Sequence, residues 1–303
     1  AAGKHADAAR AFGKALQLRP DHAQTAFEVG RALNALESHD AALGVFEAAL
    51  AIEPQDAAGH AGYAEALQGT RRLQDARTEL LRATELAPKI YVFHRRLGEV
   101  LRSLGRAGEA VQALGTAADL APTDAATQRA LGLALREAGD YERSIEALSV
   151  AVNLGQQDGE LSIGMGASLY SIGRHGEARD WLSAARHQSP NDMDARYFLG
   201  LTAFALGDAA RAKTEIDASL AVNPEDARYL VASGRLLESE KRLLNPLLKG
   251  GLRQLGKLCA SRNRCRPAGT RPAQGQQHPH GPKRGLQGFK GTRCSSRASA
   301  SGR

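Results

Sequence analysis

Large apolar residues recur every 34 positions along the first 240 residues of this 303-residue chain. One ladder of such positions, each 34 residues after the last, consists of Phe12, Phe46, Leu80, Leu114, Leu148, Leu182 and Ile216. A second ladder, with Ala203 as its one exception, consists of Leu33, Leu67, Leu101, Leu135, Leu169 and Leu237. A repeated structural unit must repeat its core residues as well as the residues that end its helices, so the sequence predicts a 34-residue repeat.

Small residues follow the same period. Glycine recurs, with Ala64 filling one gap, at Gly30, Gly98, Gly132, Gly166, Gly200 and Gly234. One alanine ladder, interrupted by Ser144, is Ala8, Ala42, Ala76, Ala110, Ala178 and Ala212, and another, ending in Ser219, is Ala15, Ala49, Ala83, Ala117, Ala151 and Ala185. Within each half unit the apolar and small positions lie three and four residues apart, on one helical face. Each unit is therefore predicted to be a pair of antiparallel helices whose small residues let the backbones approach closely.

The boundaries of these predicted helices repeat as well. Glycine, which permits the tight turn between the two helices of a unit, occurs at Gly105, Gly139, Gly173 and Gly207. Proline, which cannot continue a helix, ends the second helix at Pro20, Pro54, Pro88, Pro122, Pro190 and Pro224. Two residues after the proline position, aspartate is expected to cap the next helix at Asp56, Asp124, Asp158, Asp192 and Asp226.

With small, large and proline residues in this order, the chain resembles the tetratricopeptide repeats (TPRs) over about residues 1–240. The resemblance implies an all-α fold, a right-handed superhelical solenoid of antiparallel helix pairs, whose first helices line a concave groove for a peptide or helix. The aromatic residue usual early in the first helix is replaced by Ala26, His60, His94, Gln128, Ser162, Arg196 and Leu230. Gln156 stands where a proline is expected, near Gly155 and Gly159, which predicts a looser junction in the stack.

Four segments are predicted along the chain. Residues 1–22 form a truncated half repeat, since Gly3 already falls at the turn position, and the start at Ala1 indicates a piece of a longer protein. Residues 23–240 hold six TPR units and the first helix of a seventh. Residues 241–260 form a capping helix over the last repeat, with Asn245 as its cap and Pro246 at its first position. Residues 261–303, without periodicity, form a disordered basic tail.

The net charge of +7 combines two unlike regions. Residues 1–240 carry 25 Lys and Arg against 33 Asp and Glu, whereas residues 241–303 carry 15 basic residues and no acid. A flexible cationic segment gains free energy from counterion release on nucleic acid, so nucleic-acid binding is a minor alternative function, confined to the tail. A second interpretation is that a change of reading frame produced the tail, which would explain the abrupt end of the period.

No arrangement typical of a catalytic or metal site is found in the sequence. Cys259, Cys265 and Cys294 all lie in the tail and lack the paired short spacing of zinc ligands. His60 and His94 stand one unit apart at a position expected to pack in the core. No nucleophile elbow, phosphate-binding loop or membrane-spanning apolar run is present. We therefore expect no enzyme, no cofactor, no metal and no membrane span.

Binding specificity is expected on the exposed face of the first helices. Four arginines in the middle of this face form a basic quartet, Arg95, Arg102, Arg129 and Arg136, bordered by Glu65 and Glu99, which are expected to pair with some of them. Beside the quartet lies an apolar patch of Leu133, Ile163, Tyr170, Tyr197, Leu201 and Phe204. The alternatives are a solvated face for the quartet and packing against a neighbouring helix or the tail for the patch. If they form a binding face, the quartet and the patch together predict a protein or peptide partner with acidic residues beside a hydrophobic or aromatic anchor.

The function predicted from these residues is a protein-interaction scaffold that holds a peptide or helix of a partner in the groove. The alternative is a substrate-recruiting TPR region of a larger enzyme, such as a glycosyltransferase, because such arrays also precede transferase domains. The Ala-, Arg- and Gly-rich composition favours a bacterial protein of the cytoplasm or periplasm.

Overall fold

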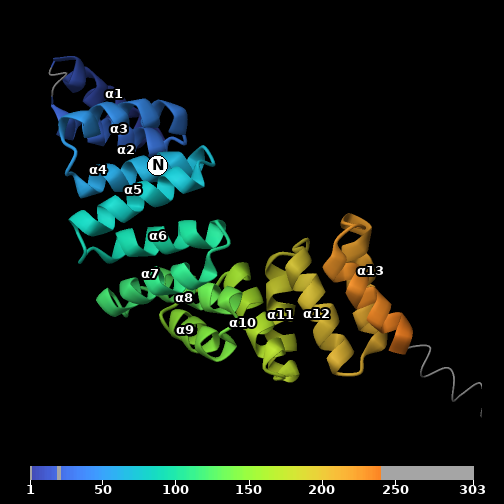
Figure 1. Ribbon diagram of the computed structural model, residues 1–303. Helices are drawn as coiled ribbons and strands as arrows, with labels where there is room; N and C mark the ends of the chain where they lie inside the picture. The colour runs from blue at the N-terminus through green and yellow to red at the C-terminus, as the bar shows by residue number, and fades with distance from the viewer. Residues whose placement is uncertain (1, 19–21, 240–303) are drawn as a thin grey trace, which may run out of the picture. The chain divides into compact units, whose positions relative to one another are not determined.

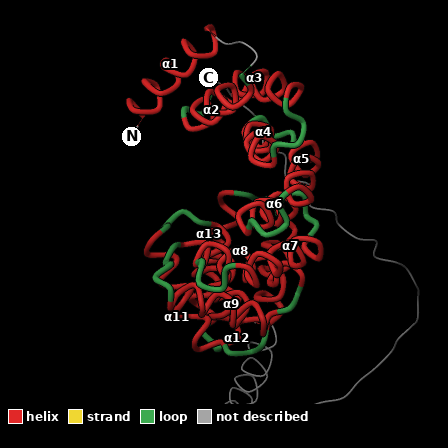
Figure 2. Tube along the Cα trace, turned by 90° about the vertical axis from the view of Figure 1, so that its left-hand side faces the viewer, coloured by secondary structure: helices red, strands yellow, loops and turns green. Residues whose placement is uncertain are grey.

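A computed structural model describes residues 2–18 and 22–239 of the chain, and its helices follow one another in sequence order (Figure 1). The helices are α1 (Ala2–Leu18), α2 (Ala23–Ala35), α3 (His39–Ile52), α4 (Ala57–Gly69), α5 (Leu73–Leu86), α6 (Tyr91–Ser103), α7 (Ala107–Leu120), α8 (Ala125–Ala138), α9 (Tyr141–Asn153), α10 (Gly159–Ser171), α11 (His175–Gln188), α12 (Met193–Ala205) and α13 (Ala209–Val222). Residues 227–239 are also helical. The described residues contain helices, turns and loops but no strand, so the predicted all-α solenoid of helix pairs is confirmed (Figure 2).

The helices alternate between two roles. The even-numbered helices α2 to α12 are the first helices of the predicted units, and each packs against the odd-numbered second helix that follows it. Several successive first helices also contact each other directly, namely α2 with α4, α6 with α8, α8 with α10, and α10 with α12. Second helices one unit apart make no comparable contact within the described part of the chain. The first helices therefore form the more closely packed layer.

One contact recurs inside every helix pair. A large side chain of the second helix fills the space beside a glycine or alanine 16 positions earlier, on the first helix. A methyl group built on Gly132 would lie 2.6 Å from Cγ of Leu148, and one built on Gly30 would lie 2.7 Å from the ring of Phe46. The filling residues, all buried, are Phe46, Leu80, Leu114, Leu148, Leu182 and Ile216. Because the two backbones can approach only where the first helix lacks a large side chain, this contact explains both ladders.

The turn within each unit needs one residue in the left-handed backbone region. The predicted glycines occupy it, with φ between 72° and 86°, at Gly105, Gly139, Gly173 and Gly207. In the two units before them the same position is held by Glu37 and Arg71, with φ of 57° and 62°. A side chain with a Cβ atom is strained in this region, so these two turns are less favourable than the glycine turns.

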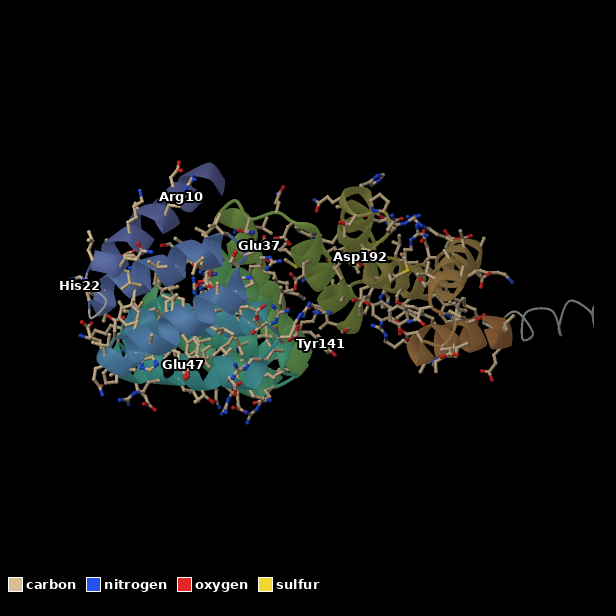
Figure 3. All side chains as sticks on the ribbon, turned by 90° about the horizontal axis from the view of Figure 1, so that it is seen from above. Arg10, His22, Glu37, Glu47, Tyr141 and Asp192 are labelled. Atoms are coloured by element: carbon tan, nitrogen blue, oxygen red, sulfur yellow. The ribbon has the colours of Figure 1, made fainter. Side chains whose placement is uncertain are left out.

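Helix caps lie where the aspartates predict them. The carboxylates of Asp56, Asp124, Asp158 and Asp192 each accept a hydrogen bond from the backbone N–H three residues later. Asp226 accepts one from the N–H of Arg228. His22 caps α2 in the same way through Nδ1, and Figure 3 labels this residue together with Asp192. The first helices therefore begin at fixed residues, with their orphan N–H groups partly satisfied.

Polar side chains at the position of the missing aromatic residue tie the first helix to the loop before it. Each contacts the carbonyl oxygen of the proline six residues earlier. The pairs and distances are His60 with Pro54 (3.0 Å), His94 with Pro88 (2.9 Å), Gln128 with Pro122 (3.1 Å) and Arg196 with Pro190 (2.8 Å). Ser162, which follows the unit without a proline, contacts the carbonyl of Asp158 instead (2.9 Å). Both histidines are partly buried here and are not core residues, although the sequence pattern places them at a core position.

The junction at Gln156 is closed by a different local structure. Helix α9 ends at Asn153, one residue before the period predicts, and Gly155 follows with a φ of 90°. Asp158, the N-cap of α10, has a backbone φ of −142° and ψ of 170°. Asp124, the N-cap of α8, has a φ of −81° and a ψ of 104°. A looser stack at this point stays a prediction.

One predicted turn, at Gly3, is not found, and several predicted segments lie outside the residues that the structure describes. Gly3, predicted to lie in a turn, is inside α1. The capping helix over 241–260, the basic tail over 261–303 and the three cysteines fall outside the residues that the structure describes.

Replacing Arg71 by glycine should stabilise the array. Arg71→Gly removes the Cβ atom from a left-handed residue, which should raise the free energy of unfolding by roughly 1 kcal/mol. Arg71→Ala keeps the Cβ atom and serves as the control, so it should have no such effect. Urea denaturation of the three proteins measures the difference, and equal midpoints for the glycine and alanine variants would contradict it.

Candidate functional site

Three of the four predicted arginines line one open pocket on the first helices. This charged pocket has a volume of about 490 Å³ and lies among α6, α8, α10 and α12. Arg102, Arg129, Arg136 and Ile163, all predicted site residues, contribute to its lining. Five carboxylates contribute as well, namely Glu137, Asp158, Glu160, Asp192 and Asp194. The pocket therefore contains more acidic than basic groups, whereas the sequence predicts a basic centre for this face.

Ion pairs within the charged pocket join one repeat to the next. Arg102 of α6 donates from Nη2 to Glu137 of α8 at 2.7 Å and to Glu160 of α10 at 3.2 Å. Arg129 of α8 donates from Nε to Asp158 at 2.7 Å and also pairs with Glu160. The quartet is thus largely neutralised, and its arginines tie three successive units together.

The remaining arginines of the quartet are paired less closely. Arg95 lies outside the lining of the charged pocket and contacts Glu99 on its own helix at 3.2 Å, as expected. Glu65, the other bordering acid, pairs instead with Arg96 at 2.8 Å. Arg136 Nη2 lies 3.8 Å from Glu137. The Nε atoms of Arg95 and Arg136 are shielded from solvent without a hydrogen-bond partner among the described residues.

The pKa values in this pocket reflect the pairing. Burial alone would lower the pKa of Arg102, but the hydrogen bonds and charges of Glu137 and Glu160 hold it above its ordinary value. For Asp158, burial would raise the pKa, yet the N–H of Leu161 and the guanidinium of Arg129 hold it below its ordinary value. Both shifts favour the charged forms of Arg102 and Asp158.

A second pocket on the first-helix side is apolar. It has a volume of about 90 Å³ and contains Tyr170, Leu201 and Phe204 of the predicted patch. Its other lining residues are Gly200, Ile216, Ala232, Arg235 and Leu236. Arg235 forms no ion pair with any described residue, so within the described part of the chain this apolar pocket has a cation at its wall without a carboxylate partner.

Tyr197 packs beside the apolar pocket within an aromatic cluster. Its ring centroid lies 5.2 Å from that of Phe198 and 5.4 Å from that of Tyr229. The guanidinium of Arg228 stands 5.6 Å from the Tyr197 centroid and is held by Asp194 at 3.0 Å. Burial raises the pKa of the Tyr197 hydroxyl, so this residue offers a neutral, partly exposed surface.

Two predicted patch residues are less exposed than the sequence indicates. Leu133 is fully buried, so its prediction as a surface residue is wrong. It fills the space beside Gly164 of the next first helix, where an added methyl group would lie 2.6 Å from Leu133 Cδ2. Ile163 is 7% exposed yet reaches the wall of the charged pocket.

Residues outside the sequence-predicted site complete both pockets. Glu137 follows directly after Arg136, so one further ladder at the next position would have found it. Arg235 lies 34 positions after Leu201 of the predicted patch, but its nearness to Phe204 depends on how two neighbouring helices pack. Among the described residues, no cluster of His, Cys, Asp or Glu is arranged to hold a metal ion. None of the described helices combines the length and hydrophobicity needed to cross a membrane.

Comparison with known families identifies the repeat. Two family profiles, each described as tetratricopeptide repeat, match the chain. One matches residues 1–57, 64–125 and 129–193, and the other matches residues 33–93 and 169–236. Matched repeats thus extend over more than half of the chain. No curated protein matches its sequence.

Several solved structures share this fold. The APC/C hetero-tetramer Cut9–Hcn1 is similar with a TM-score of 0.63 and 19% identity, covering 78% of this chain and 46% of that one. Pseudomonas aeruginosa PilF is similar with a TM-score of 0.59 and 18% identity, covering 70% and 97%. YrrB, described as a TPR protein with an unusual peptide-binding site, has a TM-score of 0.51 and 23% identity, covering 62% and 97%. The chain spans about half the length of the Cut9–Hcn1 chain that it matches.

Asp158 should make the stability of the array depend on pH. A carboxylate with a lowered folded-state pKa stabilises the fold above its unfolded-state pKa of about 3.9, and this contribution is lost as the pH falls through the folded-state value. Asp158→Asn retains a helix cap but cannot ionise, so it should be less stable than the wild type at neutral pH. Urea denaturation should show this difference shrinking toward acid. In an Arg129→Gln background the difference should be smaller at neutral pH, and a pH-independent difference would contradict the prediction.

Proposed function

The chain belongs to the tetratricopeptide repeat family, whose arrays serve as protein-interaction scaffolds, and on this premise we propose that its first-helix side binds a peptide or helix of a partner protein. The supporting observation is the apolar pocket, whose Tyr170, Leu201 and Phe204 remain partly exposed on the more closely packed layer of helices. Partly exposed aromatic side chains around a pocket are typical of a contact surface.

The apolar pocket receives the anchor residue of the partner. An aromatic or branched aliphatic side chain would contact Phe204 and Leu236 and exclude water from a space of about 90 Å³. Arg235 lies at the same pocket without a carboxylate partner among the described residues. A carboxylate next to the anchor would satisfy this guanidinium through a charge-assisted hydrogen bond. The partner therefore carries an acidic residue beside its hydrophobic anchor.

The charged pocket receives further acidic residues by exchange. Its arginines already have carboxylate partners, so a ligand must replace one of them rather than meet a free cation. Glu160 is the most exposed of the paired acids, with 53% of its side chain accessible against 29% for Glu137 and 33% for Asp158. A ligand carboxylate would displace Glu160 from Arg102 and Arg129, because the ion pairs of the most exposed acid are the weakest and cost the least free energy to break.

A substrate-recruiting region of a larger enzyme would use the same surface. In that alternative the bound segment belongs to the substrate, and the catalytic domain lies elsewhere in the polypeptide. The recognition chemistry of the two pockets would be unchanged, so the experiments below apply to both functions.

Peptides selected against the full chain should reveal the anchor. A phage-displayed library should enrich sequences that place Asp or Glu within a few residues of an aromatic or branched aliphatic residue. Phe204→Ala should then weaken binding of a selected peptide about ten-fold or more, measured by fluorescence anisotropy, because it removes a wall of the pocket. Leu206→Ala is the matched control, since Leu206 is exposed at the end of the same helix but lies outside the pocket. Equal losses in both variants, or none in either, would contradict binding in the apolar pocket.

Removing the displaceable acid should strengthen binding. Glu160→Gln leaves Arg102 and Arg129 with less carboxylate competition, so an acidic selected peptide should bind several-fold more tightly at low salt. The gain should decrease as salt is added, because salt screens partly exposed charges. Glu142→Gln, on the second-helix side of the neighbouring unit, is the control and should leave the affinity unchanged. An unaltered affinity of Glu160→Gln in titration calorimetry would remove the charged pocket from the binding site.

A further inference from the structure

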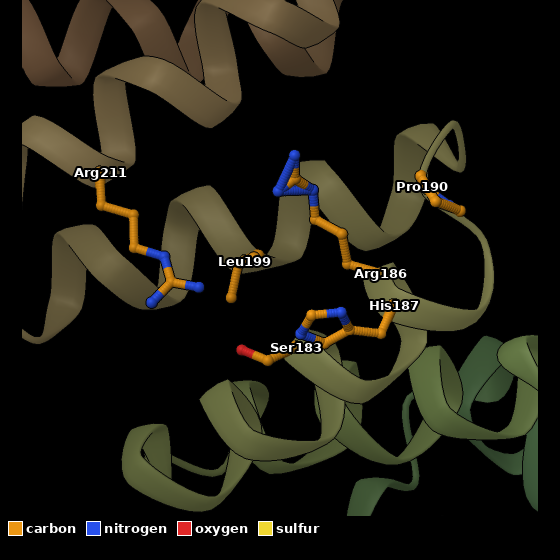
Figure 4. A pocket seen from close by; sticks show the side chains of 6 residues that line it. All are labelled: Ser183, Arg186, His187, Pro190, Leu199 and Arg211. Atoms are coloured by element: carbon orange, nitrogen blue, oxygen red, sulfur yellow. The ribbon is translucent and has the colours of Figure 1, made fainter.

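A third pocket lies on the opposite, second-helix side of the array, between α11 and α13. It has a volume of about 250 Å³ and is outside both pockets described above. Ser183, Arg186 and His187 line it from α11, and Arg211 lines it from α13 (Figure 4). The buried Leu199 of α12 and the loop residue Pro190 complete its lining.

The polar groups of this pocket come from two helices and surround one space. Ser183, Arg186 and His187 are three and four residues apart, so they share one face of α11. Figure 4 shows the Ser183 hydroxyl and the His187 ring on one side of the opening and the Arg211 guanidinium across from them. A ligand in this space could therefore accept hydrogen bonds from several directions.

The charge of this pocket is only partly balanced. Arg186 Nη1 donates to Glu215 at 2.8 Å, and the Glu215 side chain is only 6% exposed. The Arg186 Nε atom is shielded from solvent and has no hydrogen-bond partner among the described residues. Neither Arg211 nor His187 forms an ion pair within the described chain. The Asp208 carboxylate caps the helix by accepting a hydrogen bond from the backbone N–H of Arg211. It does not contact the Arg211 guanidinium.

This arrangement contrasts with the charged pocket on the first-helix side. There the two central arginines each contact two carboxylates, and the lining contains more acids than bases. Here Glu215 is the one carboxylate, among the residues that the structure describes, that pairs with a lining residue, and it does not itself belong to the lining. Because Glu215 is buried, it holds the Arg186 side chain in place and leaves the open space to cationic and hydroxyl donors.

We propose that the pocket between α11 and α13 binds a tetrahedral oxyanion of the phosphoryl class. Two guanidinium groups, an imidazole and a hydroxyl can donate hydrogen bonds to several oxygens of one anion, whereas a carboxylate offers only two. Arginine is the side chain best suited to such anions, because its planar group donates two parallel hydrogen bonds. The volume leaves room for part of the molecule that carries the phosphoryl group.

Titration of the full chain with inorganic phosphate tests this site. The ionic strength is held constant with sodium chloride, and the arginine Nε–H resonances are followed by nuclear magnetic resonance. The Arg186 and Arg211 signals should shift together and reach saturation. Arg143 and Arg179, which lie outside the pocket and pair with Asp140 and Asp180, report non-specific binding and should change little. Unsaturable shifts of similar size at all four arginines would overturn the proposal.

Variants and a second anion make the test specific. Arg211→Ala should weaken phosphate binding about ten-fold or more, because it removes a charged donor, whereas Arg179→Ala should leave it unchanged. Arg211 is exposed, so its replacement should preserve the fold, and the circular dichroism spectrum checks this. Acetate should bind more weakly than phosphate. Equal binding of both anions would overturn the tetrahedral class, and full affinity in Arg211→Ala would overturn the site.

Discussion

The array depends on a single repeated contact, in which a large side chain of the second helix occupies the space that glycine or alanine leaves on the first. Leu148 beside Gly132 and Phe46 beside Gly30 show it in two units. Since protein interiors are packed as densely as organic crystals, a larger residue on the first helix would push the pair apart. The contact brings the helices of a unit together, and the charged pocket, the apolar pocket and the pocket between α11 and α13 are all built on helices held in this way.

Features that depend on nearby residues could be predicted from the sequence. An aspartate cap needs only a backbone N–H three residues later, and a glycine turn needs only one residue with a positive φ. Asp124 and Gly139 therefore lie where the period predicts them. Packing between units was harder to predict, because the period does not show which side chain of one unit meets which residue of the next. Leu133 illustrates this point, since the sequence predicts it on the exposed face of the first helices but its side chain fills the space beside Gly164.

The candidate site shows the same limit. The ladders brought together Tyr170, Leu201 and Phe204, which share one pocket because regular spacing places them on neighbouring first helices. They predicted Glu99 as a partner of the quartet, as it is through Arg95, but did not predict the acids that pair with Arg102 and Arg129. Arg102 and Glu160 lie 58 positions apart and meet only because a long side chain reaches across two repeats. The reach of a side chain is not encoded in a periodic pattern, so the basic quartet could be found in the sequence but the pairing of Arg102 and Arg129 across repeats could not.

The arginines of this array therefore divide by what they contact. Arg102 and Arg129 join successive units, and because their charges are compensated by acids, they exert little attraction at a distance. Arg235 and Arg211 have no carboxylate partner among the described residues, and each lines a pocket. An uncompensated charge at a concave surface raises the local concentration of the opposite charge far more than a paired one does. Recognition of anionic groups should thus begin where arginines are unpaired, while the paired arginines contribute only after a ligand has displaced an acid.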